Sequence, residues 1–175
     1  MEQIKIRELD SKDLLSNLKD LATILHASVS AGASVGFILP YSPEDSEDFW
    51  KSKVYPSLKN KDRLLLVATV DKKIAGTVQL DMDMLPNQVH RCEVLKLLVH
   101  PEFRRKGIAR KLMIELEKRA DYFDRSLITL DTRTGDTAEP FYRSLGYEIA
   151  GVIPGYCRAA EKAHYDATTY MYKRL

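Results

Sequence analysis

The segment from residue 91 to residue 120 constrains the fold more than any other part of the chain. Residues 91–99 have the pattern of a strand, and a helical pattern over 107–120 follows after a turn at Pro101. A strand that passes through a short turn into an amphipathic helix is typical of domains in which helices cover a sheet. The segment therefore favours an α/β (α+β) fold.

Apolar patterns elsewhere in the chain predict six more strands and three more helices. The expected strands are 4–9, 63–70, 74–82, 91–99, 126–131, 147–153 and 168–173, and the expected helices are 11–29, 42–55, 107–120 and 137–145. A loop over 154–167 separates the last two strands. Because no repeat or Gly/Ser linker interrupts this order, we expect a single domain over 1–175. Its sheet should be mixed, mostly antiparallel, of about seven strands, with helices on both faces.

Charge and cysteine content exclude several classes of protein. The 27 basic and 25 acidic residues leave a net charge of only +2, which gives no general attraction to nucleic acid or to an anionic membrane. Cys92 and Cys157 are too few for a disulfide framework and indicate a reducing compartment. The residues 1–9 show no secretory pattern, and the apolar run 64–70 is far shorter than the ~20 residues of a membrane span. We expect a cytoplasmic protein without nucleic-acid or membrane partners.

The turn after residue 99 has the composition of an anion site. A helix that begins at Gly107 directs its first amide N–H groups toward the turn, where residues 104–109 are able to surround a phosphate. Positive charges surround this point at Arg104, Arg105, Lys106, Arg110 and Lys111. They suit a diphosphate together with a further phosphate. Neither a Walker A loop nor a Rossmann glycine motif is present.

The turn resembles a known family motif. Residues 104–109, Arg-Arg-Lys-Gly-Ile-Ala, match the Arg/Gln-x-x-Gly-x-Gly/Ala motif of the GNAT superfamily of N-acetyltransferases, and the element order along nearly the entire chain is similar to that fold. More narrowly, segments similar to those of the tabtoxin-resistance acetyltransferases are 32–37, 93–97, 130–132, 138–142 and 154–157. The resemblance implies acetyl-CoA as co-substrate and no metal.

The resemblance also implies which residues serve the reaction. The strand at 97–99 would hold the pantetheine arm, amides 104–109 the pyrophosphate, and Tyr142 would protonate the departing thiolate. The implied cofactor contacts are Leu97, Leu98, Val99, Arg104, Arg105, Lys106, Gly107, Ile108, Ala109, Thr132, Ala138 and Phe141. Many family members carry an Asn where this chain has Asp131, so that contact departs from the pattern. Packing of Tyr142 in the core is the alternative to its catalytic role.

Acetyl transfer to an amine also requires removal of a proton, because an alkyl ammonium with a pKa near ~10 is protonated at neutral pH. Glu93 and Asp131, on the two strands that flank the expected cleft, are the candidate bases. Both carboxylates could instead bind the ammonium, with water as the base. A main-chain amide near Leu98 is suited to stabilise the oxyanion. An acetyl-cysteine route through Cys157 is the less favoured alternative.

The acceptor should lie opposite the cofactor, between residues 32–37 and 154–158, where Ser34, Phe37 and Tyr156 are the candidate substrate contacts. We expect a primary amine of a small molecule as the acceptor. The alternatives are a protein N-terminus or lysine, or a protein that binds CoA without catalysis. The identity of the amine and the formation of a homodimer stay open at this stage, because a fold does not fix a substrate.

Overall fold

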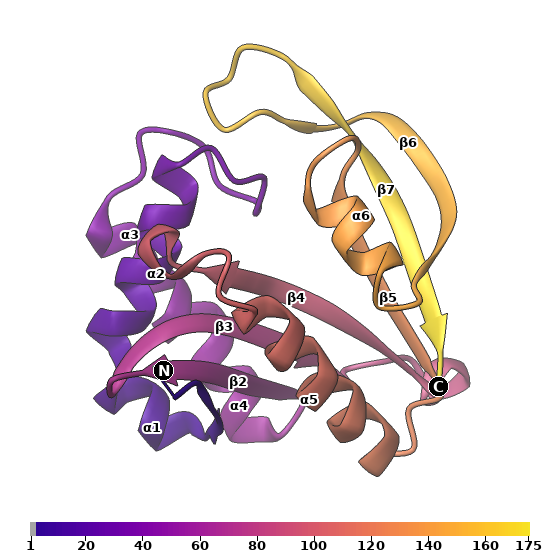
Figure 1. Cartoon of the computed structure of the whole chain (residues 1–175), viewed down its shortest axis with the longest axis horizontal. Helices are drawn as coiled ribbons and strands as arrows, with labels where there is room; N and C mark the ends of the chain where they lie inside the picture. Colours follow the sequence, from indigo (N-terminus) through magenta and orange to yellow (C-terminus); the bar gives the residue numbers. More distant parts are fainter. Residues whose placement is uncertain (1–2) are drawn as a thin grey trace.

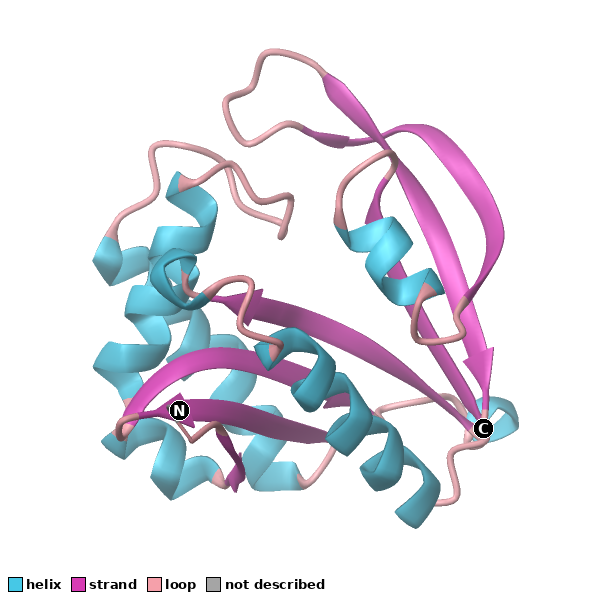
Figure 2. Ribbon diagram, viewed as in Figure 1, coloured by secondary structure: helices cyan, strands magenta, loops and turns pink. Residues whose placement is uncertain are grey.

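The computed structural model describes residues 3–175 and contains a seven-stranded sheet with helices on both faces (Figures 1 and 2). The strands are β1 (Lys5–Leu9), β2 (Arg63–Val70), β3 (Lys73–Asp81), β4 (Arg91–Val99), β5 (Leu127–Arg133), β6 (Glu148–Arg158) and β7 (Tyr165–Arg174). The α-helices are α1 (Ser11–Ser16), α2 (Leu18–Ser30), α3 (Pro43–Phe49), α4 (Tyr55–Asn60), α5 (Ile108–Tyr122) and α6 (Ala138–Arg143). The predicted mixed sheet and its two helical layers are confirmed.

The strand order is β1-β2-β3-β4-β5-β7-β6. Each neighbouring pair within residues 3–175 is antiparallel except β4 and β5, which run parallel. These two strands pair over only three positions, from Arg91↔Leu127 to Glu93↔Thr129. Beyond Glu93 the strands diverge, as Figure 1 shows. The sheet therefore opens at the carboxyl ends of its parallel pair, where open α/β sheets bind ligands.

Two apolar layers sandwich the sheet. Alternate residues of β2 point to opposite faces, so Leu64 and Leu66 join the core beneath α5 and α6, whereas Leu65 and Val67 join the core formed with α1 to α4. Burial on both faces explains why β2 is a nearly continuous apolar run. Both cores hold the N-terminal half of the sheet, and this support fixes the position of β4.

The two N-terminal helices differ from their predicted bounds. The expected helix 11–29 breaks at Asn17 into α1 and α2. The expected helix 42–55 instead continues to Asn60 through a π-helical turn at Trp50–Val54. Pro56 explains the wider turn, because proline donates no N–H and its ring collides with the carbonyl of an ordinary α-helical turn. Ser42 caps the start of α3, where its hydroxyl accepts a hydrogen bond from the Asp45 amide at 3.0 Å.

The predicted loop 154–167 is wrong. Strand β6 extends to Arg158, and β7 already begins at Tyr165. The register passes from Ile153↔Thr168 to Cys157↔Asp166, so residues 154–156 form a bulge. Pro154 is tolerated because β6 is an edge strand, where a missing amide hydrogen costs no ladder bond. The bulge carries Tyr156 and Cys157 toward the opening of the sheet.

Candidate active site

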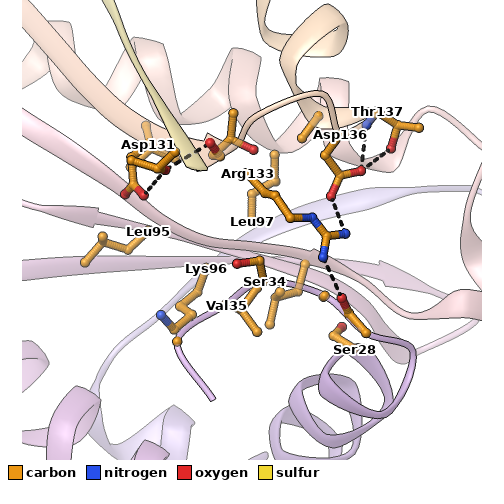
Figure 3. Close-up of a pocket in the computed structure, with 18 of the residues that line it drawn as sticks. Ser28, Ser34, Val35, Leu95, Lys96, Leu97, Asp131, Arg133, Asp136 and Thr137 are labelled. Atoms are coloured by element: carbon orange, nitrogen blue, oxygen red, sulfur yellow. Dashed lines mark hydrogen bonds and ion pairs between the residues drawn. The ribbon is translucent and has the colours of Figure 1, made fainter. Parts of the chain in front are cut away.

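A cavity of about 540 Å³ lies where β4 and β5 diverge. Its walls are residues 94–99 of β4, residues 131–133 at the end of β5, the start of α6, and the loop 31–36 after α2. Figure 3 shows side chains from all of these elements around the opening. Strand β6 adds Tyr156 and Cys157 to the lining. Residues far apart in the sequence thus meet at the break in the sheet.

The exposed edge of β4 forms one wall of this cavity. Leu97, Leu98 and Val99, the residues expected to hold the pantetheine arm, all line it. On their other side they pair with β3, through Thr77↔Leu98 and Gly76↔Val99. Since β5 has diverged at this level, no described strand pairs with the cavity-side edge of residues 94–99. This edge is available to an extended ligand, in the manner of a strand added to a sheet.

A β-bulge interrupts β4 at the middle of the cavity. The register passes from Gln79↔Leu95 to Thr77↔Leu98, so Lys96 and Leu97 stand opposite a single residue of β3. Lys96 adopts a left-handed φ of 50°, a conformation that non-glycine residues rarely take. The Thr77 hydroxyl donates to the Lys96 carbonyl at 3.1 Å and holds the bulge. The bulge turns the Lys96 side chain into the cavity wall.

The turn before α5 has the backbone of an anion site. Arg105 and Gly107 have φ values of 64° and 79°, and Gly107 is the N-cap of α5. Gly107 has no side chain that could cap the first turn of this helix, so its leading amides are suited to a ligand. Arg104 lines the cavity and donates its Nε to the Val99 carbonyl at 3.3 Å. Ile108 is buried in the core, so only its backbone is available to a ligand.

Other predicted cofactor residues divide between the cavity and its surroundings. Thr132 and Ala138 line the cavity, whereas Phe141 lies behind it, with the Arg110 guanidinium 6.0 Å from the centre of its ring. The side chains of Arg105 and Lys106 lie outside the lining, as does Ala109.

Tyr142 brings a phenol to the cavity from α6. Its side chain is only 7% exposed and packs against the rings of Phe141 and Tyr147, yet the residue also lines the cavity. Burial, reinforced by the Asp131 charge, raises the pKa of Tyr142 well above the ordinary tyrosine range. The hydroxyl therefore keeps its proton at neutral pH, as a proton donor must. Packing and a catalytic role are compatible at this position.

The two candidate bases occupy different places. Asp131 lines the cavity and accepts a hydrogen bond from the Thr168 hydroxyl at 2.9 Å. Glu93 lies outside the lining, where β4 and β5 still pair, and its carboxylate is 3.7 Å from Arg91. Burial raises the pKa of Glu93 against the opposing effect of Arg91, and Asp131 adds to the rise. The geometry brings Asp131, rather than Glu93, to the site.

The loop after α2 forms the side of the cavity where the acceptor is expected. Ser34 Oγ lies 3.5 Å from the Cys157 sulfur, and Arg133 donates to the Gly32 carbonyl at 3.3 Å. Ser34 and Tyr156, two of the predicted substrate contacts, line the cavity. Phe37, the third, lies outside the lining and packs edge-on against Phe49 at 5.2 Å.

Comparison with known proteins agrees with this geometry. A family profile described as an acetyltransferase (GNAT) domain matches residues 37–153, more than half of the chain. The chain belongs to the GNAT family of acetyltransferases. The predicted enzyme class, an acetyl-CoA-dependent N-acetyltransferase, is thereby confirmed.

An uncharacterized N-acetyltransferase from the hisH-hisA intergenic region of Azospirillum brasilense is 28% identical over 142 residues, which cover 80% of this chain and 82% of the relative. An N-acetyltransferase from Staphylococcus aureus Mu50 has a TM-score of 0.80 at 13% identity, with 98% of each chain covered. The putative acetyltransferase yncA from Salmonella typhimurium, whose structure contains acetyl-CoA, has a TM-score of 0.77 at 16% identity, with 98% of this chain and 94% of that one covered. At these identities the solved structures show a shared fold.

The residues of this acetyltransferase fit the co-substrate of its family. The unpaired edge of β4 suits a pantetheine arm, and the turn 104–107 ends in uncapped amides that suit a diphosphate. In the part of the chain that the structure describes, no cluster of three or more His, Cys, Asp or Glu side chains forms a metal site. None of the helices within residues 3–175 is both long and apolar enough to cross a membrane.

Sequence reasoning missed several residues of the GNAT cavity. Lys96 and Arg133 both line it and bear charges, and neither was singled out for a role. The sequence does mark Lys96 as a candidate, because it is the one charged residue in the apolar run 94–99. It does not mark Arg133, since the ion pair of this residue with Asp136 at 3.0 Å and its bond to the α2 loop depend on the tertiary fold.

Proposed function

We propose that the protein transfers the acetyl group of acetyl-CoA to a primary amine of a small molecule, by direct attack and with Tyr142 as the general acid. One observation carries this proposal. Tyr142, Asp131 and the unpaired edge of β4 all line the same cavity. A proton donor, a proton acceptor and a binding edge for an extended cofactor are the groups that amine acetylation requires.

Acetyl-CoA supplies the activated acetyl thioester when it binds. The main-chain groups of Leu97 to Val99 hold and orient the extended arm, and the amides at the start of α5 bind the pyrophosphate. An amide of this stretch of β4 stabilises the oxyanion through a preorganised hydrogen bond. The remaining predicted contacts, Thr132 and Ala138, line the cavity beside this path.

Tyr142 donates its proton to the sulfur that leaves. Because its pKa is raised, the phenol stays protonated over the whole physiological range of pH. The rings of Phe141 and Tyr147, 5.4 and 5.7 Å away between centroids, limit the movement of the phenol at the cavity.

Asp131 is our candidate for the group that receives the acceptor ammonium and accepts its proton. It is exposed to the cavity, and Thr168 fixes one of its oxygens. Glu93 lies outside the cavity lining, where β4 and β5 still pair. Its raised pKa suits a group that takes up a proton relayed through water from the cavity. Water without either acid is the remaining route.

Closure of the acceptor side favours a small amine over a protein segment. Three contacts join residues 32–39, between α2 and α3, to the C-terminal half of the chain: Ser34 with Cys157, Arg133 with Gly32, and the Leu39 amide with the Ala160 carbonyl at 2.8 Å. An N-terminus or lysine of a protein is the alternative acceptor. A ribosomal-protein-alanine N-acetyltransferase from Brucella melitensis shares the fold, with a TM-score of 0.76 at 19% identity and 98% and 99% of the chains covered.

The test is an incubation with acetyl-CoA and a panel of small amines, with short peptides that carry a free N-terminus or a lysine as a second arm. Release of free thiol and the mass of the acetylated product are the two readouts. Turnover with small amines supports the proposal, and turnover confined to peptides favours the alternative. If acetyl-CoA raises the melting temperature but no thiol appears, the protein binds CoA without catalysis.

We also propose a single domain over 1–175, a cytoplasmic location and a homodimer. The narrower likeness to the tabtoxin-resistance acetyltransferases is part of the same proposal. The acceptor panel needs none of them.

A further inference from the structure

Lys96 is a charged side chain of the cavity that the proposed mechanism does not use. Its ammonium lies 5.7 Å from the ring centre of Phe37 and 5.6 Å from that of Phe49. An ammonium normally forms hydrogen bonds or ion pairs, but this one forms neither with any of residues 3–175. A Cβ atom added at Gly36 would stand 3.9 Å from the Lys96 nitrogen, so the loop after α2 lies directly against it.

The surroundings of this ammonium place no counter-charge in contact with it within the described chain. Burial, with the Arg63 charge behind it, lowers the pKa of Lys96, and Asp131 opposes that effect from β5. Arg63 itself is engaged, because it forms an ion pair with Asp81 at 2.8 Å. Two aromatic faces recover part of the lost hydration of a cation, but they supply no hydrogen-bond acceptor. Three N–H donors at the cavity wall are therefore left for a ligand.

The cavity also holds a negative charge at a separate point. The Asp131 carboxylate accepts one hydrogen bond, from Thr168, and forms no ion pair within the described chain. Figure 3 shows the two charged ends apart from each other, and the Lys96 nitrogen lies beside Gly36 of the loop after α2. The acceptor side of the cavity thus presents one site for a cation and one for an anion.

We infer that the acceptor carries a carboxylate in addition to its amine, and that Lys96 binds this carboxylate while the amine lies near Asp131. The inference rests on the proposed function and names the class of its acceptor. A single ammonium between two rings suits a singly charged carboxylate, whereas a phosphate group would call for the several donors present at the start of α5. Lys96 is then a residue that determines specificity and takes no part in the proton transfers.

A purely structural role is the competing explanation. Lys96 stands at the bulge, and its contacts with Phe37 and Phe49 join β4 to the N-terminal helices. Loss of such a role would weaken the enzyme toward every acceptor. Loss of a carboxylate site would weaken it only toward acceptors that carry the carboxylate.

The experiment compares two matched series of acceptors. The first contains ω-amino acids from glycine to 6-aminohexanoate, and the second contains n-alkylamines of the same chain lengths. The series covers a range of separations between amine and carboxylate. For wild type, we expect kcat/KM for at least one ω-amino acid to exceed that of its alkylamine by about 10- to 100-fold, the range of a hydrogen bond between charged groups.

Lys96→Met should bring this ratio close to one, mainly through a higher KM for the amino acid. Because the readout is a ratio, a loss common to both acceptors cancels. Lys96→Arg keeps the positive charge and should keep a preference for the amino acid. Lys59→Met, which removes an exposed lysine on α4 far from this chemistry, is the matched control and should leave the ratio unchanged.

Each remaining outcome overturns the inference in a distinguishable way. If the wild-type kcat/KM for the alkylamines equals that for the amino acids, the carboxylate site is wrong and the proposed function stands. If Lys96→Met keeps the wild-type ratio, another group recognises the carboxylate. If neither series nor the wider amine panel is acetylated while acetyl-CoA still binds, the proposed function fails and this inference fails with it.

Discussion

Replacement of Tyr142 by Phe isolates the proton that the proposed mechanism requires. The substitution removes one oxygen from a side chain that is 7% exposed. The ring contacts with Phe141 and Tyr147 do not involve that oxygen, and its hydroxyl makes no hydrogen bond with another residue in the 3–175 range. The variant should therefore fold normally and bind acetyl-CoA with nearly unchanged affinity.

The expected loss falls on turnover. General acid catalysis contributes at least ~10²-fold, equivalent to about 2.7 kcal/mol of transition-state stabilisation. The raised pKa of Tyr142 also fixes the form of the pH profile. Because the folded protein holds this proton to a higher pH than free tyrosine does, wild-type kcat should show no alkaline decline from this group below pH ~10.

The assay measures kcat from thiol release at saturating acetyl-CoA, with a pre-steady-state experiment to separate chemistry from product release. Tyr147→Phe is a matched control, since Tyr147 is also buried in the same ring cluster but does not line the cavity. A Tyr142→Phe enzyme whose single-turnover rate equals that of wild type would refute the acid role and leave Tyr142 as a packing residue.

Three further results follow from the geometry. Gly107→Val should weaken acetyl-CoA binding at least ~10-fold in a thermal-shift titration, because a β-branched residue disfavours φ 79° and its methyl groups would enter the open space expected to hold the pyrophosphate; undiminished affinity would contradict the anion site. Asp131→Asn should lower kcat/KM more than Glu93→Gln does, most strongly at low pH, with partial recovery where free amine is abundant; if both variants match wild type across the profile, the proton leaves through water. Because the folded pKa of Glu93 is raised, its contribution to stability is fullest below the ordinary value near ~4.3 and is lost as the pH rises through the folded pKa. The melting temperature of Glu93→Gln relative to wild type should therefore increase between pH 4 and pH 7, and a constant difference would count against a buried carboxyl.

Much of this fold was readable because its core patterns are local. The run 63–70 is apolar on both faces, which predicts a strand between two layers, and the structure buries it on both sides. The last hairpin was misread for an equally physical reason. Pro154 and Gly155 are turn formers by local chemistry, yet at the edge of a sheet a bulge accommodates both of them without ending the strand.

The site was only partly readable from the sequence. Glu93 and Asp131 were equivalent candidates because each lies on a strand that flanks the opening. The register separates them, since Glu93 pairs with Thr129 at the last parallel position and Asp131 lies two residues farther along β5. Register between strands depends on tertiary packing, so no pattern within either strand distinguishes the two acids.

The divergence of β4 and β5 accounts for more of the site than any single residue does. Parallel pairing ends at Glu93, and the six residues of β4 after that point keep only β3 as a partner. The same break frees main-chain groups for an extended ligand, exposes Asp131 at the end of β5, and gives the bulge at Lys96 room to turn its side chain toward the α2 loop. A substitution that restored pairing beyond Glu93 would remove all three together. Cofactor binding and acceptor recognition are for this reason consequences of one feature of the sheet.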